Sequence, residues 1–236
     1  MINLGTAKGA FSLCQKVCFE TSNLCNYCHK KCPASLYKEK IFLPYEVVRK
    51  SLESLSEIYM DWNGLIAFHN YNEPLEDPRL FSFIGIARYY LPFCGIQIWT
   101  NGSKLTQGLL DEMIERGVTD ISVSIYSDSE RQRIGALDFS RIKSFIHSSS
   151  NLDDRLDQYD DPIIDLLSPC HQPFRQIVVR HYGKIALCCK DWDGDHDFDM
   201  GIEEFLGSKE AWDIYLAMSA GKRTPDLCRR CEWRGR

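Results

Sequence analysis

Cysteines form two groups that could each hold a metal or a cluster. The first group lies near the N-terminus and comprises Cys25, Cys28 and Cys32. The second is spread over the last third of the chain and comprises Cys170, Cys188, Cys228 and Cys231. Three protein ligands on a four-ligand centre leave one position open for a substrate or cofactor, whereas four ligands fill it. The sequence therefore predicts one catalytic centre and one auxiliary centre.

The rest of the composition narrows the functional class. The eleven cysteines cannot all pair within one chain, and the N-terminus lacks a basic segment followed by an apolar one, so we expect a cytoplasmic protein. In a reducing compartment, spaced cysteines indicate metal or cluster ligands before disulfides. The net charge is −5 and no long Lys/Arg run is present, so no nucleic-acid partner is expected. No apolar run approaches the ~18 residues of a membrane helix, so no membrane partner is expected either.

Strands and helices alternate over the first two thirds of the chain. Strands are predicted over residues 11–21, 65–68, 96–100 and 121–126, and helices over residues 43–59, 77–90 and 105–116. This order predicts parallel strands with right-handed crossovers, although periodicity leaves a barrel and an open sheet undecided. Sites in such folds lie beyond the carboxyl ends of the strands. We therefore expect Cys25, Glu73, Asn101 and Ser127 on one edge of the sheet.

The last third of the chain has a different organisation. Residues 147–169 are rich in Ser and Asp and are predicted to form a linker or lid. A β-hairpin follows over residues 177–187, with its turn at Gly183, and then a helix over residues 208–220. We therefore divide the chain into a first domain of residues 1–150 and a second of residues 151–236.

Three segments and the C-terminal cysteines resemble radical S-adenosylmethionine (SAM) enzymes. Residues 19–26 resemble the strand end and first cluster cysteine, residues 71–78 the Gly-Glu-Pro-Leu segment, and residues 100–102 the Thr-Asn-Gly segment of that family. The C-terminal cysteines resemble the single-cluster twitch form of the SPASM extension, and the layout is most similar to the family's aminocyclitol dehydrogenases. The resemblance implies an α/β fold, a partial (β/α) barrel of radical SAM type with a small C-terminal β-hairpin plus helix twitch domain.

Two departures from the family pattern bear on the site. The family usually spaces its triad by three residues and then two, whereas this chain has two and then three. A rival triad is Cys18, Cys25 and Cys28, which would place Tyr27 directly before the last ligand. We favour Cys25, Cys28 and Cys32, because Cys18 lies within the first predicted strand. The second departure is Asn72, where relatives have Gly.

The resemblance also implies cofactors and their residues. A [4Fe–4S] cluster on the first cysteine group would bind SAM, whose reductive cleavage gives a 5′-deoxyadenosyl radical that abstracts a hydrogen atom. Glu73 would accept the methionyl ammonium. The other implied SAM-site residues are Tyr27, Asn72, Asn101, Ser122 and Ser124. The plainer interpretations are a solvated carboxylate for Glu73 and an ordinary Asn-Gly turn for Asn101. A flavodoxin- or ferredoxin-type protein is the expected electron donor.

The second cysteine group has two interpretations. The twitch resemblance implies a second [4Fe–4S] cluster on Cys170, Cys188, Cys228 and Cys231, with Cys189 as an alternative to Cys188. A structural zinc ion is the other interpretation, because four thiolates can hold zinc. An auxiliary cluster near the substrate can take up an electron. That chemistry suits oxidation of a secondary alcohol to a ketone.

Such an oxidation also needs a proton acceptor or a hydrogen donor. Asp153 and Arg155, in the predicted linker, are candidate bases, although a solvated acidic loop is the plainer interpretation. Cys14, Lys16, Cys18 and Glu20 alternate along the first strand and are expected to share one face. The Cys18 thiol could give a hydrogen atom to a substrate radical, as in an epimerase, or could serve as a small buried apolar group.

The favoured function is therefore a radical SAM oxidoreductase of specialised metabolism, such as antibiotic biosynthesis. It would act on a small hydroxylated substrate of sugar or aminocyclitol type. The alternatives are a radical SAM epimerase, a peptide-modifying enzyme with the same two clusters, and a non-catalytic zinc-binding module.

Overall fold

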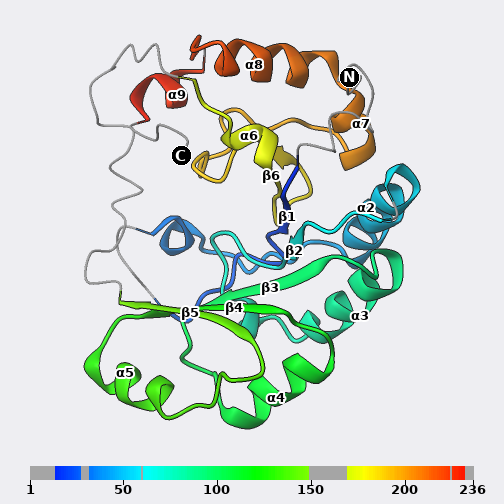
Figure 1. The fold of residues 1–236 in the computed structure, drawn as a ribbon. Coiled ribbons are helices and arrows are strands. Elements are labelled where there is room, and N and C mark those ends of the chain that lie inside the picture. Colours follow the sequence, from blue (N-terminus) through cyan, green and yellow to red (C-terminus); the bar gives the residue numbers. More distant parts are fainter. Residues whose placement is uncertain (1–13, 28–31, 60, 149–168, 224, 232–236) are drawn as a thin grey trace.

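One sheet of seven strands organises the residues that the structure describes. The computed structural model describes residues 14–27, 32–59, 61–148, 169–223 and 225–231. Its strand order is β5-β4-β3-β2-β1-β6-β7. The strands are β1 (Lys16–Phe19), β2 (Leu65–Ala67), β3 (Gly95–Thr100), β4 (Asp120–Ile125), β5 (Lys143–Ser148), β6 (Gln176–Val179) and β7 (Ile185–Ala186). Figure 1 shows α8 and α9 across the top of the view and α4 and α5 at the bottom, with the strands between them.

Helices connect the strands and follow the predicted alternation. The α-helices are α2 (Tyr45–Ile58), α3 (Leu80–Tyr90), α4 (Gln107–Glu115), α5 (Asp128–Gly135), α6 (Gln172–Arg175), α7 (Ile202–Gly207), α8 (Lys209–Ser219) and α9 (Asp226–Arg230). Two short 3-10 helices are η1 (Pro33–Leu36) and η2 (Pro74–Glu76). The four strands and three helices predicted before residue 127 are confirmed in the described residues, with ends that differ by a few residues, and residues 11–13 of the first predicted strand lie outside the described residues. The sequence did not predict α5, β5, α6, α7 or α9.

Local sequence signals set the ends of these helices. Thr106 and Ser127 are the N-caps of α4 and α5, and each hydroxyl accepts a hydrogen bond from a backbone N–H three residues later. Gly117 follows the last turn of α4 with a φ of 100°, in the left-handed region that glycine adopts readily. Thr106 and Ser127 thus fix where α4 and α5 begin, and Gly117 ends α4 shortly before β4.

Strands β1 to β5 are all parallel, so their carboxyl ends meet at one edge. β6 adds to the other side of β1, also parallel, and its Gln176 pairs with Lys16. β7 then pairs with β6 antiparallel, and Gly183 turns this predicted hairpin with a φ of 94°. The hairpin therefore continues the main sheet, and β1 lies inside it rather than at its edge. None of the described helices is both long and apolar enough to cross a membrane.

The two faces of the sheet differ in chemistry. The apolar face, which packs in the main core with side chains of α2, α3 and α4, consists of Val17, Phe19, Ile66, Phe68, Ile96, Ile98, Ile121 and Val123. The polar face carries Lys16, Glu20, His69, Gln97, Trp99, Ser122, Ser124 and His147, together with the small buried side chains of Cys18 and Ala67. Successive side chains along a strand point to opposite faces, which accounts for the division.

Cys14 does not share the polar face, and that prediction is wrong. It precedes β1, and its thiol donates to the backbone carbonyl of Lys16 at 3.2 Å. The side chain packs in the main apolar core and lines a small crevice with Ile177 and Phe205. The alternation of a strand does not extend to residues before it begins.

Candidate active site

A cavity of about 460 Å³ lies over the polar face of the sheet and the loops at the carboxyl ends of its parallel strands. Both cysteine groups line it, through Cys25, Cys32, Cys170, Cys188, Cys189, Cys228 and Cys231. Cys28 lies outside the described residues. Cys25 and Cys231 therefore line the same cavity, although they are about two hundred positions apart in the sequence.

Cys25 and Cys32 are neighbours on one side of the cavity. Burial raises the pKa of the Cys25 thiol to about 11, and the charges of Glu73 and Cys32 raise it further. The Asn101 side-chain amide lies 4.0 Å from Cys25 Sγ and also donates to Asn26 Oδ1 at 2.8 Å. The loop after β1 and the loop after β3 are thus joined beside these thiols.

Cys18 has a different environment. It is fully buried on β1 in a small cluster with Ala67, Val178 and Ala186, and among the described residues it is not part of the cavity lining. Gln176 Nε2 donates to its sulfur at 3.1 Å, and burial raises the pKa of the Cys18 thiol to about 11. Cys32, rather than Cys18, therefore faces the cavity beside Cys25.

The C-terminal thiols form a second set of mutual neighbours. Burial raises the pKa of the Cys228 thiol to about 12, and the charges of Cys170 and Cys231 raise it further. The pKa of the Cys188 thiol is raised well above its usual value by burial and then by Cys189 and Cys228. Within the described ranges, no three His, Cys, Asp or Glu side chains converge to hold one metal ion. The thiols are close enough to interact without surrounding a single point.

Glu73 is buried and already has three donors. Its carboxylate accepts hydrogen bonds from Leu75 N at 3.0 Å, Thr100 Oγ1 at 2.6 Å and Asn101 N at 2.7 Å. The side chain is 3% exposed, so the interpretation as a solvated carboxylate is wrong, and burial raises its pKa. Glu73 thereby fixes the segment after β2 against the end of β3, at the cavity wall.

Asn72 and Asn101 stabilise tight turns at this edge. The Asn72 side-chain amide donates to Phe68 O at 3.2 Å, and its Oδ1 accepts from Asn70 N at 3.0 Å. Asn101 Oδ1 accepts from Ser103 N at 2.9 Å, as in an ordinary Asn-Gly turn. Both side chains nevertheless line the cavity.

The remaining predicted SAM-site residues separate into two kinds. Tyr27 lines the cavity, donates to Glu130 Oε1 at 3.0 Å, and packs 4.8 Å from the Tyr126 ring. Ser124 also lines the cavity, whereas Ser122, two residues earlier on β4, is buried and is absent from the described lining. Asp153 and Arg155 lie outside the described residues, so their roles stay predictions.

The polar face contributes cavity residues that the sequence did not single out. Trp99 Nε1 donates to Ser124 Oγ at 2.9 Å, and His147 Nε2 lies 3.0 Å from the same oxygen. Lys16 donates to Gln97 Oε1 at 2.7 Å. His69 lies edge-on to Trp99, and burial, followed by the Lys16 charge, holds the pKa of its imidazole well below 6.5. The alternation of polar and apolar residues along β3 and β4 is the signal that could have found this wall.

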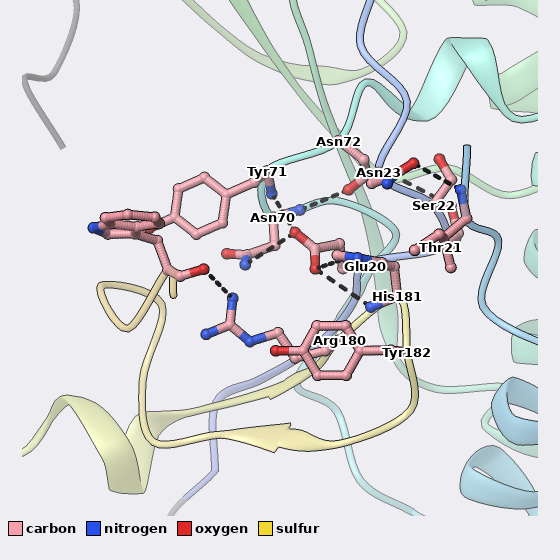
Figure 2. Close-up of polar contacts among 12 residues, drawn as sticks. Glu20, Thr21, Ser22, Asn23, Asn70, Tyr71, Asn72, Arg180, His181 and Tyr182 are labelled. Carbon is pink, nitrogen blue, oxygen red and sulfur yellow. Dashed lines mark hydrogen bonds and ion pairs between the residues drawn. The ribbon is translucent and has the colours of Figure 1, made fainter. Parts of the chain in front are cut away.

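A buried network of polar groups joins the N-terminal loops to the hairpin (Figure 2). Glu20 is fully buried and accepts from His181 Nδ1 at 2.8 Å and from Tyr71 N at 3.0 Å. Arg180 is also fully buried and is paired with Asp197 at 3.2 Å. The Tyr71 hydroxyl donates to Cys189 O at 2.7 Å. The segment that carries Glu73 is thus held to the segment that carries the Cys188 thiol.

Comparisons with known proteins agree with this arrangement. The chain is 27% identical over 233 residues to the S-adenosyl-L-methionine-dependent 2-deoxy-scyllo-inosamine dehydrogenase of Niallia circulans, and the match covers 90% of each chain. The crystal structure of BtrN in complex with AdoMet and 2-DOIA superposes with a TM-score of 0.80 at 24% identity, covering 93% of each chain. An open conformation of BtrN gives a TM-score of 0.72 at 22% identity, covering 93% of this chain and 92% of BtrN. No family model matches the chain. The predicted α/β fold class and the predicted resemblance to radical SAM enzymes are confirmed.

Proposed function

We propose that this chain is a radical SAM dehydrogenase that oxidises a secondary alcohol of a small polyhydroxylated substrate to a ketone. The observation that carries the proposal is that both cysteine groups and a polar wall line one and the same cavity of about 460 Å³. Its volume is in the range of small-molecule sites. The name of the Niallia circulans enzyme supports an aminocyclitol as the substrate class.

The first cysteine group suits an iron–sulfur cluster. Cys25 and Cys32 face the cavity, and Cys28 lies between them in the sequence, whereas Cys18 is buried away from it. Thiolates are the usual ligands of such clusters. A four-iron cluster held by these cysteines would, with SAM bound, supply the 5′-deoxyadenosyl radical chemistry. Because the pKa of the Cys25 thiol is raised, we expect cluster binding to displace its proton.

Residues around Cys25 suit the polar groups of SAM. A carboxylate offers about four lone-pair positions, so Glu73 retains acceptor capacity for an ammonium after its three hydrogen bonds. Asn101 and Tyr27 present an amide and a hydroxyl at the same cavity. Fixed by the hydrogen bonds described above, these groups would orient SAM with little rearrangement.

The second cysteine group suits an auxiliary [4Fe–4S] cluster better than zinc. Cys170, Cys188, Cys228 and Cys231 interact as neighbours, but the described thiols do not converge on the position of one ion. Cys189 also lines the cavity and remains the alternative to Cys188. The cavity between the two groups gives a substrate access to both. Asp153 and Arg155 remain the proposed bases, and a flavodoxin- or ferredoxin-type protein in the cytoplasm remains the proposed electron donor.

The experiment is anaerobic reconstitution followed by turnover with 2-deoxy-scyllo-inosamine. We expect about eight irons per chain with matching sulfide, for two four-iron clusters. With SAM and dithionite, each ketone formed should be accompanied by one 5′-deoxyadenosine. Zinc without labile sulfide would overturn the proposal. Solvent deuterium in a product of otherwise unchanged mass would identify an epimerase instead.

A further inference from the structure

Three cavity residues of the polar face lie on parallel strands of the sheet or just beyond one of them. Lys16 is on β1, His69 follows β2, and Ser124 is on β4. Lys16 is close enough to His69 for its charge to lower the pKa of the imidazole. Each side chain has a hydrogen-bond donor that is not used by any of the described protein groups.

His69 presents a donor to the cavity. The side chain is 7% exposed, and Nδ1 is shielded without a hydrogen-bond partner in the part of the chain that the structure describes. Since its pKa is low, the imidazole is neutral and carries one proton. A buried N–H without an acceptor is rarer in proteins than an unused lone pair, so the proton belongs on Nε2. Because His69 lines the cavity and Nδ1 is shielded, Nε2–H is the group left for a ligand.

The Ser124 hydroxyl can likewise only donate a hydrogen bond to a ligand. Its oxygen accepts from Trp99 Nε1 at 2.9 Å, which uses one lone pair. His147 Nδ1 is shielded and has no partner among the described residues, so the argument made for His69 places the His147 proton on Nε2. That N–H then donates to Ser124 Oγ at 3.0 Å and uses the second lone pair. The Ser124 hydroxyl can therefore act toward a ligand only as a donor.

Lys16 completes the set. Its ammonium has three N–H donors and no lone pair, and one donor is used by Gln97 Oε1 at 2.7 Å. We propose that Lys16, His69 and Ser124 form a donor wall that binds substrate oxygen atoms and excludes an amino group. This inference rests on the proposed function and adds the orientation of the substrate.

The donor wall has a chemical consequence for an aminocyclitol. A hydroxyl or ketone oxygen has lone pairs to accept from the wall, and a ketone oxygen has no proton to compete with these donors. An ammonium has no lone pair and would meet the Lys16 charge. The substrate would therefore bind with its oxygen-bearing edge toward β1, β2 and β4, and with its amino group away from them.

Anaerobic calorimetry on the two-cluster protein with SAM tests the wall. The probes are 2-deoxy-scyllo-inosamine and its diamino analogue, in which an amino group replaces the hydroxyl that is oxidised. We expect His69→Leu and Lys16→Met to weaken binding of the first probe about tenfold, and His69→Gln, which keeps an N–H donor, about threefold or less. The diamino analogue should bind the wild-type protein at least about tenfold more weakly than the first probe. His196→Gln is the matched control, because His196 is not in the described cavity lining.

SAM cleavage without substrate and the melting temperature separate this inference from folding defects. The melting temperature should stay close to the wild-type value in His69→Leu and Lys16→Met, and the His196→Gln control should keep the wild-type values of both quantities. Unchanged affinity for the first probe in His69→Leu, or equal affinity of the wild-type protein for the two probes, would overturn the donor wall. If the ketone still forms in that case, the dehydrogenase proposal stands. Wild-type protein that cleaves SAM but neither binds nor oxidises the first probe would overturn both the wall and the substrate class.

Discussion

The apolar and polar faces of the sheet are built from the same strands but serve different purposes. On the apolar face, Phe19 and Phe68 are completely buried and stack against each other at 6.2 Å. On the polar face, Trp99 is 41% exposed and borders the cavity with His69 and Ser124. Parallel sheets are usually covered on both faces by apolar side chains. A polar face in a parallel sheet therefore marks the side on which the chemistry takes place.

The largest expected effect of a substitution is the loss of SAM cleavage when a cysteine that lines the cavity is replaced. Cys25→Ala should reduce SAM cleavage to background, because the proposed cluster would lose a ligand that faces the cavity. Iron analysis and 5′-deoxyadenosine formation measure the effect. Cys18→Ala is the matched control and should keep both. If Cys18→Ala loses the iron while Cys32→Ala keeps it, the proposed ligand triad is wrong.

The second-largest expected effect is the loss of stability when an aromatic residue of the apolar face is replaced. Phe68→Ala should lower the free energy of unfolding by about 3–5 kcal/mol, because a completely buried ring is replaced by a cavity. Trp99→Ala should cost clearly less stability, since its ring is partly exposed, and should instead weaken substrate binding. Urea denaturation of the two variants compares the faces directly. Equal losses of stability would break the distinction between them.

The Glu20 pair with His181 should make stability depend on pH. Burial alone would raise the pKa of the Glu20 carboxyl, but the hydrogen bond and charge of His181, together with Arg180, hold it below 4.5. The contribution of the ionised Glu20 carboxylate to the free energy of unfolding is therefore complete above pH 4.5. It is lost as the pH falls through the lower pKa that Glu20 has in the folded state. Glu20→Gln should lower the free energy of unfolding by about 1–3 kcal/mol at pH 7. It should also make stability fall less steeply as the pH is lowered into the acid range. Urea midpoints between pH 7 and acid pH test this, and an unchanged slope in the acid range would contradict it.

The smallest expected effect is that of a substitution on the same sheet but outside the described cavity lining. Lys143 pairs with Asp120 at 2.8 Å, but the lysine side chain is 82% exposed, so water and salt screen the pair. Lys143→Ala should leave both the urea midpoint and SAM cleavage within experimental error. A measurable loss of activity would show that the functional part of the sheet extends beyond the cavity.

The sequence predicted local structure better than long-range contacts. Helices α2, α3 and α4 were predicted to within a few residues of their observed ends, and the cavity cysteines follow from their spacing. By contrast, the pairing of Lys16 with Gln176 joins segments about 160 residues apart, which no local pattern encodes. The Glu20–His181 pair depends on that pairing and was missed for the same reason. His69 was missed because a lone histidine after a short strand does not reveal its burial.

The position of β1 between β2 and β6 has a consequence for biosynthesis. While the ribosome is still making the last third of the chain, the β1 backbone groups that later pair with Gln176–Val179 have no strand beside them. An unpaired edge of apolar strand is a site for association between chains. We therefore expect the isolated first 150 residues to aggregate, and nascent chains to depend on chaperones until β6 emerges.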